Sequence, residues 1–225
     1  MKSDMLTILL VRHGMTKNNT EGRFCGITDY VLTEEGKEKL RAMVAAHPYP
    51  VPEVIYTSPA TRCIETLQIC FPGMDYEVVE DLHELDFGEF EEKTTDDLWA
   101  IQEYYQRWMK QDPTFAFPGG ELIGHVGERA SKALMEITRR SFEEGRTCIA
   151  VVTHSIVMGQ FFRRIFRKLP DGPNAHFVGN GMGLLLTVEA KDLDDEKPFV
   201  CREILPKGAP LPDLTNNPYY KYKKA

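Results

Sequence analysis

The sequence has few cysteines, and their spacing gives them no evident structural role. There are five among 225 residues, an odd number, and no two of them form a Cys-x-x-Cys pair. This pattern excludes a disulfide framework and a zinc knuckle, and it favours a protein of a reducing compartment. We therefore expect a cytoplasmic protein. The cysteines are Cys25, Cys63, Cys70, Cys148 and Cys201.

Long hydrophobic runs and an excess of basic residues are also absent. The apolar opening stretch, Met5 to Val11, is too short to span a membrane and is followed at once by Arg12 and His13. Lysine and arginine number 27 against 34 aspartates and glutamates, which gives a formal net charge of −7. An acidic chain of this kind is a poor general binder of nucleic acid. Neither a nucleic acid nor a membrane is therefore expected as a partner.

What the sequence does contain is an alternation of short apolar runs and longer helical patterns, which is typical of an α/β protein. Strands are predicted at Met5 to Val11, Glu53 to Thr57, Tyr76 to Val79, Thr147 to Thr153, Met182 to Glu189 and Phe199 to Leu205. Helices are predicted at Thr33 to Ala46, Ser58 to Phe71, Glu121 to Glu144 and Ser155 to Arg167.

The order of these segments predicts a three-layer α/β/α sandwich around a mostly parallel sheet. Each of the first four strands is followed by a loop or helix before the next, which favours parallel pairing. The last two strands are joined by a short polar stretch, so an antiparallel strand is expected near the C-terminus. Ser58 followed by Pro59 is a favourable start for the second helix.

A helical segment at 94–112 interrupts the alternation and is rich in aromatic residues. We interpret it as a lid over the end of the sheet, although aromatic residues at helical spacing also suit a core helix. We expect residues 1–206 to form a single domain with this lid inserted at about 90–120, and residues 207–225 to form a poorly ordered tail. The large apolar residues of the segment are Trp99, Ile101, Tyr104, Tyr105 and Trp108.

Chemically useful side chains follow four of the predicted strands. His13 follows the first strand, Arg62 stands in the first turn of the helix after the second, and His154 follows the fourth. The loop after the third strand carries Glu84 and Asp86. Because ligands in open α/β sheets bind at the carboxyl ends of the strands, we expect these groups to converge.

This set of residue types suits phosphoryl transfer. The guanidinium groups of Arg12 and Arg62 can hold a phosphate bidentately and neutralise its developing charge. An imidazole placed in line can attack phosphorus while a carboxylic acid protonates the departing oxygen. The spacing leaves open whether Glu84 or Asp86 is that acid. The design requires no metal and no other cofactor.

Together these stretches resemble the histidine phosphatase superfamily, whose fold is that of cofactor-dependent phosphoglycerate mutase. The resemblance covers most of the chain and is specific only when the stretches are taken together. They are Arg12-His13-Gly14, Thr16, Asn19, Arg23 to Gly36, Tyr56 to Arg62, Leu82 to Glu91, Phe117 to Glu121 and Val151 to Ser155.

The resemblance implies a role for each candidate residue. His13 would be the phosphorylated nucleophile and Glu84 the proton donor, while Arg12, Arg62 and His154 would form the phosphate pocket. Further phosphate contacts would come from Asn19, Thr16 and the backbone near Gly26, although Asn19 and Thr16 also suit loop capping. His13 must be neutral at its attacking nitrogen, and a bound phosphate should favour a cationic His154.

The residues around Glu84 favour a phosphatase over a mutase. Phosphoglycerate mutases of this family carry L-x-E-R-H-Y-G, whereas this chain has L-H-E-L-D-F-G from Leu82 to Gly88. The form here resembles the phosphatase branch, which implies a phosphomonoesterase acting on a small phosphorylated metabolite. The chain departs from that branch at Glu92 and Ser155, where glycine is common in the family.

Three other functions stay open at this point. The chain could be a phosphoglycerate mutase-type phosphoryl transferase, or it could bind a phosphorylated ligand without turnover. A metal-dependent hydrolase could use His13, His154, Glu84 and Asp86, but the sequence contains neither H-x-x-E-H nor H-E-x-x-H. A small-molecule phosphomonoester remains the expected partner, and the oligomeric state is not predicted.

Overall fold

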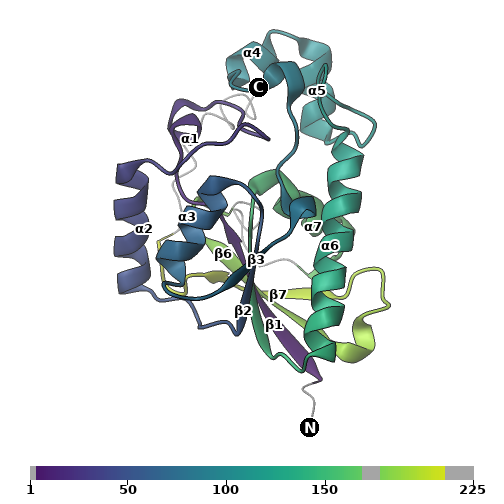
Figure 1. Cartoon of the computed structure of the whole chain (residues 1–225). Helices are drawn as coiled ribbons and strands as arrows, with labels where there is room; N and C mark the ends of the chain where they lie inside the picture. Colours follow the sequence, from purple (N-terminus) through teal and green to yellow (C-terminus); the bar gives the residue numbers. More distant parts are fainter. Residues whose placement is uncertain (1–3, 169–177, 211–225) are drawn as a thin grey trace.

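The computed structural model describes residues 4–168 and 178–210 and contains one mixed sheet (Figure 1). Seven strands lie in the order β3-β2-β4-β1-β6-β7-β5. Their bounds are β1 Met5–Arg12, β2 Val54–Thr57, β3 Tyr76–Val78, β4 Cys148–Thr153, β5 Phe166–Lys168, β6 Gly183–Glu189 and β7 Phe199–Leu205. All six predicted strands are present, with ends that differ by one residue at most.

The strand directions confirm the predicted mixed sheet. β1 is parallel to β4, β4 to β2, and β2 to β3. β6 runs antiparallel to both of its neighbours, β1 and β7, so it is the expected antiparallel strand near the C-terminus. The carboxyl ends of β1, β2 and β4 therefore meet at the same edge of the sheet.

Helices cover both faces of the sheet, as the three-layer prediction requires. In Figure 1, α2 and α3 lie on one side of the sheet and α6 on the other. α7 packs with α6 over the same core, and α1, α4 and α5 are shorter and lie in the connections. The bounds are α1 Lys17–Glu21, α2 Glu34–Ala46, α3 Thr61–Cys70, α4 Thr95–Trp99, α5 Gln102–Lys110, α6 Ile123–Glu143 and α7 Ser155–Arg164, with single turns at Glu80–Leu82, Gly88–Phe90 and Ala190–Asp192.

The alternation of side chains along β1 explains why the sheet is covered twice. Leu6, Ile8 and Leu10 pack into the apolar core beneath α6 and α7. Leu9 and Val11 point to the opposite face and pack in the core beneath α2 and α3. Apart from Thr7 and the terminal Arg12, every residue of β1 is apolar, so the strand must bury both faces, which is the pattern of a central strand in an α/β protein. Across residues 4–168 and 178–210, no helix combines the length and apolar character that crossing a bilayer requires.

Two predicted helix ends were wrong by three residues, and the helix predicted from Glu121 begins two residues later, at Ile123. The helix predicted from Ser58 begins at Thr61, with Ala60 as its N-cap. The Ser58 hydroxyl accepts the Ala60 N–H at 3.3 Å and also bonds His154, so this serine serves the loop rather than the helix.

The helix predicted to run to Arg167 ends at Arg164 instead. The chain then enters β5, which the sequence did not reveal and which pairs in parallel with β7. Burial of Phe166 against Phe199, with ring centroids 6.0 Å apart, explains the change of structure.

The predicted lid forms α4 and α5, at the end of the molecule where β1 and β4 finish (Figure 1). Its aromatic residues divide between two environments. Tyr104 packs against Phe90 at 5.9 Å, which is an ordinary core contact. Trp108 packs against Phe24 at 5.7 Å and also lines the main cavity. Ile101 is exposed. The expected tail lies outside the described residues from position 211 onward.

Glu92, where the family commonly has glycine, adopts a left-handed backbone with φ of 65°. We predict that Glu92→Gly raises the free energy of unfolding by about 0.5–1 kcal/mol, because a side chain in this conformation costs roughly 1–2 kcal/mol and glycine recovers part of it. Denaturant unfolding of both proteins measures the difference. Glu92→Ala is the control, since it removes the charge but keeps the Cβ atom. An equal gain in the alanine variant would contradict backbone strain as the cause.

Candidate active site

Three strand ends bring the candidate residues to one edge of the sheet. His13 follows β1, and its backbone N–H donates to the Thr153 carbonyl at the end of β4 at 3.0 Å. His154 comes directly after Thr153, and the two imidazole centroids lie 5.3 Å apart. The Thr153 hydroxyl donates to the Leu82 carbonyl at 2.9 Å, which holds the loop that carries Glu84 against the same edge.

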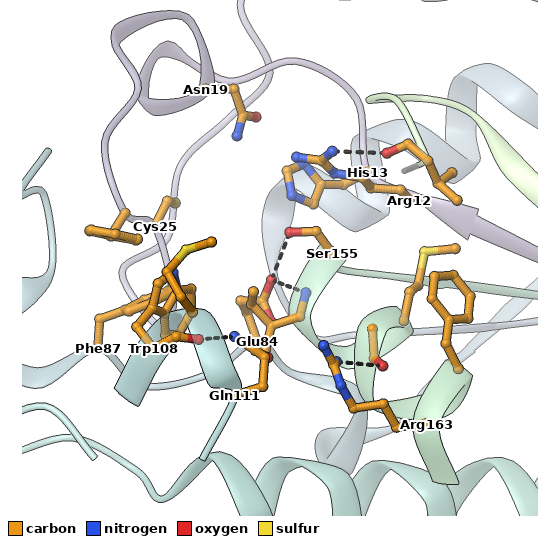
Figure 2. A pocket seen from close by; sticks show the side chains of 17 residues that line it. Arg12, His13, Asn19, Cys25, Glu84, Phe87, Trp108, Gln111, Ser155 and Arg163 are labelled. Atoms are coloured by element: carbon orange, nitrogen blue, oxygen red, sulfur yellow. Dashed lines mark hydrogen bonds between the residues drawn. The ribbon is translucent and has the colours of Figure 1, made fainter. Parts of the chain in front are cut away.

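A cavity of about 260 Å³ opens at this edge (Figure 2). Four of the predicted residues line one end of the cavity, which we call the reacting end: Arg12, His13, Asn19 and Glu84. The rest of the wall comes mainly from the loop after α1, from α5 and from α7, and most of it was not predicted as a site. The apolar side chains of that wall are Phe24, Phe87, Trp108, Met109, Ile156, Met158, Phe162 and Val178.

His13 is held in one tautomer at the inner end of the cavity. Its Nδ1–H donates to the Gly14 carbonyl at 2.7 Å, so Nε2 is the nitrogen that carries the free lone pair in the neutral ring. Burial lowers the pKa of His13 well below its usual value, and the positive charges of Arg62 and Arg12 lower it further. The imidazole is therefore neutral near pH 7, as a nucleophile must be.

Glu84 is a buried carboxyl group on the opposite wall of the cavity. Burial raises its pKa, although backbone N–H groups oppose the shift. Oε2 accepts the Ile156 N–H at 3.1 Å and the Ser155 hydroxyl at 3.4 Å, and Oε1 accepts the Leu85 N–H at 3.1 Å. A carboxyl group with a raised pKa is suited to giving and taking a proton near neutral pH.

The structure separates the two carboxylates that the spacing left open. Asp86 does not line the cavity, and its Oδ1 accepts the Gly88 N–H at 2.8 Å within its own loop. Glu84 does line the cavity. His83, which stands beside it, donates its Nδ1–H to the Glu84 carbonyl at 2.8 Å and lies outside the cavity wall. Glu84 is therefore the carboxyl group that can reach a ligand.

Arg62 is buried behind the cavity wall, in the first turn of α3 as predicted. Its Nη2 and Nη1 donate to the carbonyls of Gly26 at 2.6 Å and Thr28 at 3.1 Å. A carboxylate oxygen of Asp29 is 4.0 Å from Nη1. Its Nε–H is buried and has no acceptor within the described part of the chain. The guanidinium therefore keeps a positive charge and a donor beneath His13.

His154 lies in the same buried layer and is fully enclosed. Its Nε2 bonds the Ser58 hydroxyl at 2.7 Å. Burial lowers the pKa of His154 well below its usual value, and the charge of Arg62 adds to the effect. The imidazole of His154 is therefore neutral. The expectation from the sequence was that a bound phosphate favours the cationic form of this ring, and that stays a prediction.

Asn19 caps α1 and also lines the cavity, and its predicted phosphate contact stays a prediction. Its Oδ1 accepts the Thr16 N–H at 3.1 Å and the Asn180 amide at 3.0 Å, so it caps α1. The Asn19 amide nitrogen points into the cavity (Figure 2). Thr16 is fully buried and acts within the cap, away from the cavity wall.

The Gly26 N–H is not directed at the cavity. It donates to both carboxylate oxygens of Glu91 at 3.1 Å, and the Glu91 oxygens also accept the N–H groups of Ile27 and Phe87. Here Glu91 accepts the Gly26 N–H, and the Gly26 carbonyl accepts Nη2 of Arg62, so a phosphate contact from the backbone near Gly26 stays a prediction.

Two supporting residues were missed. The Asn180 amide donates to the carbonyls of His13 and Gly14 at 3.2 Å each and so holds the nucleophile loop. Arg129 on α6 donates to the carbonyls of His83 at 2.8 Å and Glu84 at 3.1 Å. It is also paired with Glu121 at 2.8 Å. The Phe117 to Glu121 motif signalled Glu121, whereas no local pattern marks Asn180.

The acidic and imidazole side chains near the cavity do not form a cluster of metal ligands. Within residues 4–168 and 178–210, no three histidine, cysteine, aspartate or glutamate side chains are grouped closely enough to hold an ion. The metal-dependent hydrolase considered from the sequence would use His13, His154, Glu84 and Asp86. The Asp86 carboxylate instead accepts the Gly88 N–H within its own loop. Metal independence itself stays a prediction.

Sequence comparison relates this chain to enzymes with phosphatase and mutase names. Phosphoserine phosphatase 1 of Hydrogenobacter thermophilus is 27% identical over 157 residues, covering 68% of this chain and 73% of that protein. The 2,3-bisphosphoglycerate-dependent phosphoglycerate mutase 2 of Gloeobacter violaceus is 31% identical over 175 residues, covering 73% of this chain and 76% of that protein.

Solved structures show the same fold. A phosphoglycerate mutase from Bacillus anthracis superposes with a TM-score of 0.73 at 21% identity, over 90% of this chain and 93% of that chain. A phosphoglycerate mutase from Thermus thermophilus superposes with a TM-score of 0.63 at 26% identity, over 88% and 98%. The sequence profile of the histidine phosphatase superfamily (branch 1) matches residues 8–192. The chain therefore belongs to the histidine phosphatase superfamily, as a phosphatase or mutase enzyme with the phosphoglycerate mutase-like fold.

Proposed function

We propose that this protein is a metal-independent phosphomonoesterase that acts on a small phosphorylated metabolite through a phosphohistidine at His13. The observation that carries the proposal is the tautomer of His13. Because Nδ1–H is bonded to the Gly14 carbonyl, the lone pair of Nε2 is the one available in a cavity that also contains Arg12 and Glu84. The five free cysteines favour a reducing compartment, and we place the reaction in the cytoplasm.

In the first step, His13 Nε2 attacks the phosphorus atom of the ester. The bond between phosphorus and the ester oxygen breaks, and the electron pair goes to that oxygen. Glu84 supplies the proton that makes the departing group an alcohol. Arg12 and the neutral Asn19 amide line the cavity, and the charges of Arg12 and Arg62 act on His13, so hydrogen-bond donors and positive charge would stabilise the transferring phosphoryl group.

In the second step, a water molecule attacks the phosphorus of the phosphohistidine. The phosphorus–nitrogen bond breaks and its electron pair returns to Nε2, while the Glu84 carboxylate takes a proton from the water. Inorganic phosphate leaves, and His13 is again neutral with its proton on Nδ1. Splitting one difficult displacement into two easier ones is the general advantage of a covalent intermediate.

The choice of hydrolysis over mutase transfer rests on the loop that carries Glu84. Leu85 and Asp86 stand where the mutases of the family have the Arg-His pair, and Asp86 is used to cap its own loop. The relatives carry both phosphatase and mutase names, so they support phosphoryl transfer in general. They do not indicate whether water or a second hydroxyl group accepts the phosphoryl group, and that choice rests on the residues around Glu84. With water as the acceptor, the products are an alcohol and inorganic phosphate.

We predict that His13→Ala lowers the turnover of 4-nitrophenyl phosphate by a factor of about 10⁴ or more, because removing a nucleophile abolishes the covalent route. Mass spectrometry after an alkaline quench should detect a phosphoryl group on His13 of the wild type. His125→Ala, which changes an exposed histidine on α6, is the matched control and should keep full activity. Excess chelator should leave the wild-type rate unchanged. Turnover that survives in His13→Ala would refute the proposed intermediate.

Glu84→Gln is expected to slow alkyl phosphates by about a hundredfold or more, because their leaving groups need a proton from a general acid. The loss should be much smaller for 4-nitrophenyl phosphate, whose leaving group departs unprotonated. The raised pKa of Glu84 places the fall in wild-type activity on the alkaline side, where the carboxyl group loses its proton, and the variant should lack this limb. Asp86→Asn is the control. Equal slowing of both substrates would show that Glu84 is not the acid.

Incubation with 3-phosphoglycerate and a trace of 2,3-bisphosphoglycerate distinguishes the phosphatase from the mutase. We predict that release of inorganic phosphate exceeds formation of 2-phosphoglycerate, because the Glu84 loop lacks the Arg-His pair of the mutases. Phosphate is measured by a colorimetric assay and the two isomers by NMR. Isomerisation faster than phosphate release would overturn the assignment as a phosphatase while leaving the phosphohistidine intact.

A further inference from the structure

The outer part of the cavity contains one charged side chain that the proposed chemistry does not use. Arg12, His13 and Glu84 all belong to the reacting end, whereas Arg163 lines the wall contributed by α7. In Figure 2 the Arg163 side chain runs from α7 toward the centre of the pocket. Around it the wall is apolar, with Met158 and Phe162 from the same helix.

Arg163 has no carboxylate partner among residues 4–168 and 178–210. Its Nη1–H donates to the Gly159 carbonyl, one turn earlier in α7, at 3.0 Å. The next residue, Arg164, is paired with Glu128 at 3.6 Å and does not line the cavity. Both arginines stand in the last turn of α7, where a cation is favoured by the helix dipole. Of these two arginines, Arg163 is therefore the one whose donors remain available to a ligand in the pocket.

The environment of Arg163 makes an anionic ligand favourable there. Neighbouring atoms lower the pKa of Arg163 through partial burial, although the residue as a whole is exposed. A guanidinium that has no carboxylate partner among the described residues can form charge-assisted hydrogen bonds with an anion that enters the cavity. Among the described residues, Glu84 is the carboxyl group that lines the cavity, and it lies at the reacting end with Arg12 and His13 rather than beside Arg163.

We propose that Arg163 forms a second anion subsite, so that the preferred substrate is a phosphomonoester whose leaving group carries a carboxylate or another anionic group. The carbon body of that leaving group would lie along the apolar wall, against Trp108 and Met158. This inference rests on the proposed phosphatase function and adds to it a class of substrate. Arg163 acts on selection, because it lies outside the reacting end.

The experiment compares straight-chain ω-carboxyalkyl phosphates of increasing length with the alkyl phosphate of equal length. At the best length, the wild type should prefer the carboxylate by about tenfold in kcat/KM, which corresponds to one charge-assisted hydrogen bond. Arg163→Gln should bring this ratio close to one, chiefly through KM. Arg164→Gln is the matched control and should keep the wild-type ratio. Alkanediol bisphosphates form a second arm, and a larger loss for them would assign the subsite to phosphate.

A ratio that is unchanged in Arg163→Gln, or that falls equally in Arg164→Gln, would overturn the subsite. Failure of the phosphatase proposal is a separate result, seen as absence of turnover for every ester in the wild type. In that event, calorimetry of the binding of the same carboxyalkyl phosphate to the wild type and to Arg163→Gln still tests whether Arg163 forms an anion subsite. A weaker affinity in the variant supports the subsite, and an equal affinity refutes it.

Discussion

The site depends on the parallel pairing of β1 with β4. In this register Arg12 stands opposite Thr153, so the residues that follow, His13 and His154, leave the sheet at the same level. Both strands are apolar on both faces, and a slip of one residue would exchange every side chain between the two cores. The hydrophobic packing of the sheet therefore fixes the separation of the two imidazoles. The positions of the two histidines therefore follow from the packing of the strands and do not depend on a contribution of either histidine to the free energy of folding.

Charge is the second constraint, and it arises from how the arginines are bonded. Arg12 donates to the Val178 carbonyl, and Arg62 donates to the carbonyls of Gly26 and Thr28. Carbonyl oxygens satisfy these guanidinium donors without cancelling the positive charge. The remaining charge lowers the pKa of His13 and attracts an anion to the same place. One arrangement thus keeps His13 neutral and makes this part of an acidic chain favourable for an anion.

The sequence predicted the strands and the converging residues because those signals are local: an apolar run that ends at Arg12-His13, or at Thr153-His154. It did not separate Glu84 from Asp86, since both are acidic residues of one loop and only the fold decides which one faces the cavity. Asn180 and Arg129 were missed because they act on backbone carbonyls far away in the chain. The hydrogen bonds from the Gly26 N–H to Glu91 were not foreseen for a similar reason, because Glu91 belongs to a separate loop.

The cavity has two ends with different origins, and this division shapes what the enzyme can select. The reacting end is built from residues that directly follow strands or are held to them, so its geometry is tied to the core. The outer wall comes from α5 and α7, which Gln111 and Gln160 link by a side-chain hydrogen bond of 3.3 Å. Substitutions on these helices can change which leaving group fits without moving β1 or β4. The proposed selection by Arg163 and the proposed phosphoryl transfer by His13 would therefore be mechanically separable, although both residues line one cavity.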